Sequence, residues 1–86
     1  MEKLKSMPYA QAHIRRLTNT VVLTSYATDV AAIIGGVLVV YGLYSMTTRK
    51  HISAFCKQFG MDYSIAKKCY TDHLGYDMAT REYVAL

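Results

Sequence analysis

The sequence feature that most constrains the fold is an apolar run from Val21 to Met46, in which Asp29 is the only charged residue. An α-helix needs about 20 residues to cross about 30 Å of hydrocarbon, so a tilted helix over this run is long enough to span a bilayer. Arg49, Lys50 and His51 follow at once, as a basic stop at a membrane surface would. The run is too long and begins too late for a secretory signal peptide. We therefore expect one transmembrane helix.

The rest of the chain is expected to flank this span. Hydrophobic residues make up 52% of the 86 residues, and they concentrate in the run, which leaves little for a separate water-soluble core. The formal net charge of +4 comes from basic residues on both sides of it. The sequence predicts an all-α protein with a short basic N-terminal segment over 1–19, a transmembrane helix over 20–47 and an amphipathic helical tail over 48–86. A helix buried in a soluble core is the alternative.

Small residues gather on one side of the expected transmembrane helix, at spacings of three and four. Small side chains let helices approach closely in lipid, where no hydrophobic force joins them. A carboxylate such as Asp29 costs about 2.5–3.5 kcal/mol at mid-helix, so it should meet a donor on another helix or lie near the headgroups. The predicted helix-packing residues are Ser25, Asp29, Ala31, Ala32, Gly35 and Gly36.

The tail is expected to form three short helices. The first runs through 52–59 to Gly60, the second from Asp62 or Ser64 to about Leu74, and the third follows Asp77. If the first two fold back on each other, the only two cysteines, Cys56 and Cys69, face across the hairpin. They form a disulfide in an oxidising space, or they remain reduced and act as small buried hydrophobic residues.

No residue pattern recommends a reaction. The sequence lacks phosphate-binding glycine loops, HExxH and CxxC, and its histidines do not join the cysteines at metal-ligand spacing. We therefore expect no catalytic residues, no metal and no cofactor, and a protein that is not an enzyme.

This layout resembles that of the small single-span accessory subunits of mitochondrial inner-membrane complexes, such as those of cytochrome c oxidase and ATP synthase. The resemblance implies a non-catalytic subunit that packs through its transmembrane helix and helps assemble a complex of the respiratory chain or of oxidative phosphorylation. It also implies single-pass placement in the mitochondrial inner membrane, with other subunits and lipids as partners. The alternative is a membrane-tethered interaction module whose C-terminal helices recruit a soluble partner.

The tail carries two local resemblances. Residues 59–86 resemble the three-helix ubiquitin-associated fold in their loop, central helix and last turn. The same region resembles a helix-turn-helix through Cys56, Gly60 and Ala66. Lys67 and Lys68 alone make a thin phosphate-binding surface, so nucleic acid is not an expected partner.

Overall fold

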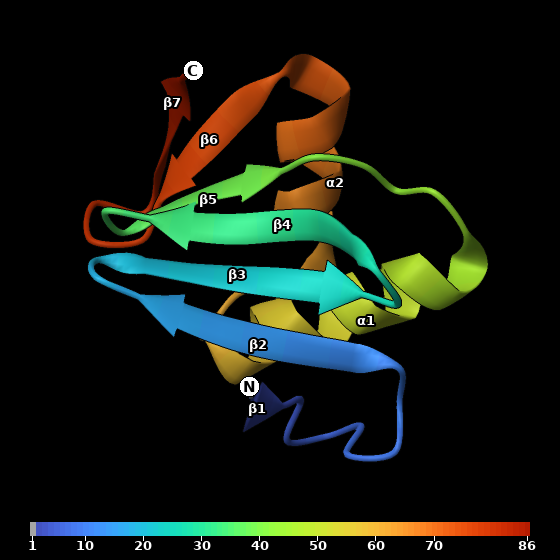
Figure 1. The fold of residues 1–86 in the computed structure, drawn as a ribbon. Coiled ribbons are helices and arrows are strands. Elements are labelled where there is room, and N and C mark those ends of the chain that lie inside the picture. The colour runs from blue at the N-terminus through green and yellow to red at the C-terminus, as the bar shows by residue number, and fades with distance from the viewer. Residues whose placement is uncertain (1) are drawn as a thin grey trace.

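The computed structural model describes residues 2–86 as an antiparallel sheet with two helices. The strands lie in the sheet in the order in which they occur in the chain, and both helices are inserted between the fifth and sixth strands (Figure 1). The elements are β1 (Glu2–Lys3), β2 (Ala12–Leu17), β3 (Thr20–Ser25), β4 (Thr28–Ile34), β5 (Val37–Val40), α1 (Met46–Gln58), α2 (Tyr63–Asp72), β6 (Leu74–Asp77) and β7 (Glu82–Ala85).

The expected all-α fold is wrong, because the apolar run folds as strands β3, β4 and β5. Valine, isoleucine and threonine dominate this stretch, and these β-branched side chains suit a pleated sheet. Gly35 and Gly36 both have positive φ, 58° and 80°, and they form the two-residue loop between the paired residues Ile34 and Val37. A loop of this kind with positive φ at both positions matches the twist of a β-hairpin. The run is therefore broken by tight turns.

The predicted transmembrane helix over 20–47 is wrong for the same reason. Among the described residues no helix is both long enough and apolar enough to span a membrane. The longest, α1, has 13 residues and is about 20 Å long, against about 30 Å of hydrocarbon. The single-pass placement in the mitochondrial inner membrane is therefore corrected, as are the membrane and transmembrane descriptions that went with it.

The core lies between one face of the sheet and the two helices. Alternate strand residues point to this face, and Ile14, Leu23 and Leu38 are fully buried there against Ile52 and Phe55 of α1. Figure 1 shows both helices on the same side of the sheet, α1 behind β3 and α2 behind β4 and β5. The opposite side, which we call the open face, has no described element over it.

The tail is helical only in part. The two helices before and after Gly60 are present, but the third expected helix is wrong: residues 74–85 form the hairpin β6–β7. His73, with φ of 56°, ends α2 in a left-handed conformation, so the chain leaves the helix as a strand. Tyr76 and Tyr83 then pair across the hairpin with ring centroids 5.3 Å apart. Cross-strand aromatic pairs of this kind stabilise a sheet.

Candidate functional site

The two helices are joined by a short, well-tied turn over residues 59–62. Met61 donates its backbone N–H to the carbonyl of Cys56, and Phe59 donates to the carbonyl of Phe55. Gly60 has φ of 82°, a left-handed conformation in which a side chain would be strained. Asp62 is then the N-cap residue of α2. The turn fixes α2 relative to α1.

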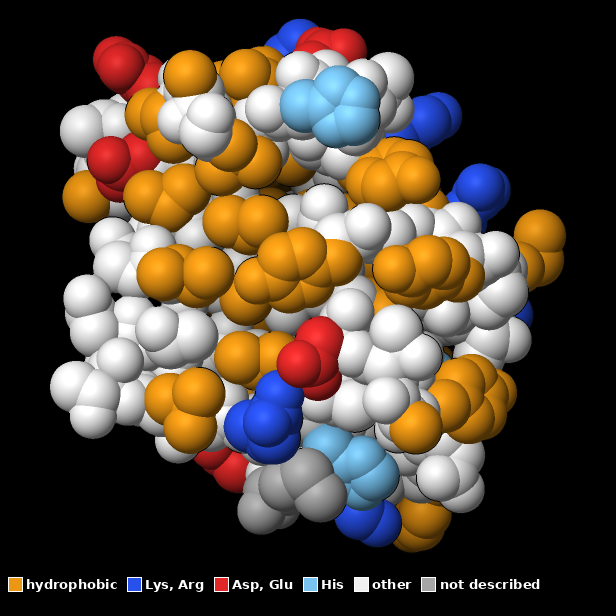
Figure 2. Space-filling view, turned by 45° about the horizontal axis from the view of Figure 1, so that its top comes forward, with side chains coloured by type: hydrophobic (Ala, Val, Ile, Leu, Met, Phe, Trp, Pro, Cys, Tyr) orange, Lys and Arg blue, Asp and Glu red, His pale blue; other side chains and the backbone are white. Residues whose placement is uncertain are grey.

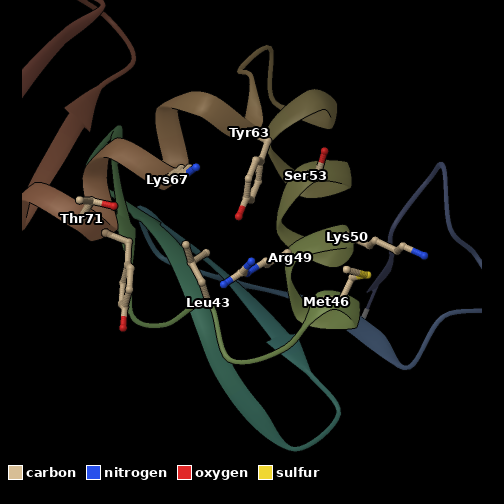
Figure 3. Close-up of a pocket in the computed structure, with 9 residues that line it drawn as sticks. Leu43, Met46, Arg49, Lys50, Ser53, Tyr63, Lys67 and Thr71 are labelled. Atoms are coloured by element: carbon tan, nitrogen blue, oxygen red, sulfur yellow. The ribbon is translucent and has the colours of Figure 1, made fainter.

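A groove of about 670 Å³ lies between the exposed sides of the two helices (Figure 3). It combines cationic groups, tyrosine rings and hydroxyls, with Leu43 from the connection after β5 at one side. The residues that line it are Leu43, Met46, Arg49, Lys50, Ser53, Tyr63, Lys67, Tyr70 and Thr71.

The groove is electropositive. Figure 3 shows Arg49 reaching from α1 and Lys67 from α2 toward the space beside Tyr63, while Lys50 points away from α2. No carboxylate is among the lining residues. The ion pairs found within residues 2–86 use other cations, namely Arg15, Arg16 and Lys68. The charges of the groove are thus available to an external anion.

A buried polar cluster holds α1 on the sheet. The Oγ atom of Ser25, at the end of β3, lies 2.8 Å from Nδ1 of His51 and 3.5 Å from Oγ1 of Thr48. The side chain of Ser45 caps the helix by accepting the Thr48 N–H at 3.1 Å. Burial lowers the pKa of His51, so the ring is neutral at pH 7. The cluster sets the position of the first turn of α1, which carries Arg49.

The same cluster is poorly suited to nucleophilic catalysis. Ser25 and His51 are only 2% and 1% exposed. Within the described residues, the hydrogen bonds of His51 include none to a carboxylate that would orient the ring as in a catalytic triad. Nor do those residues contain a group of three or more His, Cys, Asp or Glu side chains placed to hold a metal ion.

The chain was also compared with known proteins. Residues 1–72 match the model of a family of unknown function, DUF8033. The chain belongs to the DUF8033 family. No curated protein and no solved structure matches this DUF8033 chain. The matched residues run from β1 to the end of α2, so they include every residue that lines the groove.

The residues predicted to pack one helix face are dispersed in this DUF8033 chain. Ser25 is buried in the polar cluster, and Asp29 is exposed on β4, 2.8 Å from Arg15. Ala31 and Ala32 are neighbours in β4, so they are buried on opposite faces of the sheet, where they pair with Val40 and Val39 of β5. The two glycines form the β4–β5 turn. The six residues form no single surface, because a strand sends neighbouring residues to opposite faces, whereas a helix would bring these six to one side.

The cysteines lie on the packed sides of the two helices. Both are free thiols and buried. Burial, and then the neighbouring Cys69 and Asp62, raise the pKa of Cys56 to about 12. Burial also raises the pKa of Cys69. Thiols that stay protonated are poor nucleophiles, so this pair serves packing rather than reaction.

Sequence reasoning missed the groove. Arg49 and Lys50 were interpreted as a basic membrane stop, and Lys67 was considered only with its neighbour Lys68. The signal that would have found the groove is the helix-turn-helix spacing of Cys56, Gly60 and Ala66, because that motif places the two helices together.

Proposed function

We propose that this chain is a non-catalytic domain that binds duplex DNA through α1 and α2. The observation that carries the proposal is the groove between the helices, with its inward-pointing Arg49 and Lys67 and no lining carboxylate. Phosphate contacts from such side chains supply most of the affinity of a DNA-binding surface. The hydroxyls of Ser53 and Thr71 add neutral donors of the kind that also contact phosphate oxygens.

The packing of the two helices supports this proposal. A helix-turn-helix joins two steeply crossing helices by a turn of three or four residues that often contains glycine. Here the turn covers residues 59–62 and contains Gly60, and Figures 1 and 3 both show α2 crossing α1 steeply. The side chains that hold such a pair together are buried, namely Phe55, Cys56, Met61, Ala66 and Cys69.

The exposed side of α2 has the size and the polar side chains needed to enter the major groove of DNA. Ser64, Lys67 and Thr71 are exposed at spacings of three and four, so they share one helix face opposite the buried Ala66 and Cys69. The helix has 10 residues and is about 15 Å long. The major groove of B-DNA, about 12 Å wide, admits an α-helix.

The test is DNA binding by a variant that loses the cations of the groove. In Arg49→Gln/Lys50→Gln/Lys67→Gln, fluorescence anisotropy with a duplex of about 20 base pairs should show at least a tenfold loss of affinity at low salt. Because each lost phosphate contact removes about one unit from the slope of log K against log salt, the slope should also flatten.

The matched control is Lys3→Gln/Lys5→Gln/Arg81→Gln, which removes the same charge from exposed positions outside the groove. It should bind DNA nearly as the unchanged chain does. Equal losses in both variants would mean that net charge alone attracts the DNA. No binding by the unchanged chain at about 50 mM salt, or a clear preference for duplex RNA, would overturn the proposal.

A further inference from the structure

The open face of the sheet is apolar across most of its width. Exposed apolar side chains on it, at 45–69% exposure, include Leu17, Ile34 and Leu86. Strand alternation from the register places Leu17 and Ile34 on this face, since they lie in one row across β2 to β4 with Thr20. Figure 2 shows hydrophobic side chains gathered over neighbouring strands of the sheet.

The β5–β7 end of the sheet continues this surface on the same face. A Cβ atom built on Gly75 would meet Val37, Val84 and Leu86, so these three side chains lie together on the same face. Val39 follows Val37 at the next position of the same strand face. The apolar part of the open face therefore lies mainly over β4, β5 and β7, while Arg15 and Thr24 make the β2–β3 end more polar. Its main members are Leu17, Ile34, Val37, Val39, Val84 and Leu86.

Such a surface is unusual for a sheet that meets water. An antiparallel sheet with one solvated face alternates apolar and polar residues, whereas a sheet covered on both faces reads as continuous apolar runs. β4 and β5 are of the second type, since Ala32 and Val39 on the open face are as apolar as Ala31 and Val40 on the covered one. Exposed apolar side chains gathered on one face in this way mark an interaction site.

We propose that the open face binds the open face of a second copy of this chain, which makes a two-sheet sandwich. The charged side chains of the face leave its apolar part free. Arg15 and Asp29 pair with each other at 2.8 Å, and Asp77 and Glu82 lie at the β6–β7 turn, so the apolar part needs no opposite charge from another type of partner. Thr24 also donates to Asp29 within the same face.

The size of the face also fits a dimer. The two larger Cα extents of the whole molecule, 33 and 28 Å, set an upper limit of about 900 Å² on the projected area of the face. A stable interface of standard size buries about 800 Å² on each partner. A copy placed sheet to sheet uses nearly the whole face, at a spacing of about 10 Å. The proposal does not depend on DNA binding, since α1 and α2 lie on the other side of each sheet.

The test is the mass of the chain in solution, measured by sedimentation at about 1–100 μM. Interfaces of this size have dissociation constants of micromolar or lower, so a dimer should be populated in this range. We expect a species of twice 9.7 kDa. Ile34→Glu and Leu17→Glu each place a carboxylate on an exposed position of the face, on separate strands. Because a two-fold interface contains each substitution twice, the dissociation constant should rise by roughly a hundredfold or more.

The matched control is Tyr9→Glu, at a 95% exposed position in the connection between β1 and β2, which should leave the dimer intact. A monomer at all concentrations, or a dimer that survives both substitutions on the face, would overturn the proposal. Hydroxyl-radical footprinting of the unchanged chain gives an independent readout if the variants unfold. Leu17, Ile34 and Leu86 should lose reactivity on association while the exposed Met46 keeps it, and the reverse pattern would contradict the proposal.

Discussion

At the scale of single residues, the contact between Ser25 and His51 helps to fix the first helix on the sheet, together with the buried Ile52 and Phe55. It joins the end of β3 to the second turn of α1 across 26 positions of the sequence. A buried imidazole without a hydrogen-bond partner would be costly, and the Ser25 hydroxyl supplies that partner. The position of Arg49, two residues before His51, follows from this contact.

The buried imidazole makes the stability of the fold depend on pH. Burial holds the pKa of His51 below its ordinary value of 6.5, so below that pH the unfolded chain takes up a proton that the folded chain resists. The contribution of the neutral His51 to the free energy of unfolding is complete above pH 6.5. It is lost as the pH falls toward the pKa of His51 in the folded chain. In His51→Asn, the free energy of unfolding in urea should therefore change less between about pH 7.5 and about pH 5.5 than in the unchanged chain.

The control for this prediction is His73→Asn. His73 is exposed, and its φ of 56° is one that asparagine accepts, so the substitution removes an imidazole without removing a buried contact. It should keep the pH dependence of the unchanged chain. If His51→Asn kept it as well, another group would be responsible for the acid sensitivity.

At the scale of elements, the turn over Gly35 and Gly36 separates β4 from β5 and thereby turns one apolar run into a sheet. Both residues need positive φ. Gly36→Val should cost about 1–2 kcal/mol of unfolding free energy, because an L side chain is strained in that conformation. Gly35→Asn should be nearly neutral, since Asn-Gly is a favoured pair in such turns and the added Cβ would meet only ordinary contact, with Asn19 at 3.5 Å. Chemical denaturation of the two variants checks the difference, and equal costs would contradict this turn type.

The turn also explains why the sequence misled the prediction of this region. Gly35 and Gly36 were interpreted as small residues in a helix interface, although a glycine pair between β-branched runs is equally a hairpin signal. Alternation, the usual sign of a strand, is absent because β4 and β5 carry apolar residues on both faces. The hydrophobic content of an apolar run without alternation does not distinguish strands buried on both faces from a membrane-spanning helix.

The helical part of the chain was more accessible to sequence reasoning. Apolar residues at helical spacing and the break at Gly60 predicted two helices there, and the structure has α1 and α2 on either side of that glycine. Residues 74–85 were not accessible in this way. They form strands because β5 offers an edge to pair with, a tertiary effect that no local pattern records. The groove depends on the same tertiary placement, since Arg49 and Lys67 come from different helices.

At the scale of the whole molecule, the two proposed surfaces lie on opposite sides of one thin layer. The groove belongs to the helices and the apolar surface to the uncovered side of the sheet, and the shortest dimension of the chain is 20 Å. In a sheet-to-sheet dimer the helix pairs would be outermost, facing away from each other. Two grooves in that arrangement cannot meet adjacent turns of one straight duplex, as the recognition helices of ordinary dimeric helix-turn-helix proteins do.

The arrangement predicts that the chain bridges two separate duplexes. With one duplex held on beads and a second carrying a fluorophore, the unchanged chain should retain fluorescence on the beads, because each copy in the dimer binds one duplex. Ile34→Glu should still bind a single duplex but retain little of the second, since it lacks the dimer while keeping the groove. The groove variant Arg49→Gln/Lys50→Gln/Lys67→Gln should fail at both steps. If Ile34→Glu retained as much of the second duplex as the unchanged chain, bridging would need no sheet-to-sheet contact. That result would contradict the proposed dimer and leave the proposed DNA-binding groove unaffected.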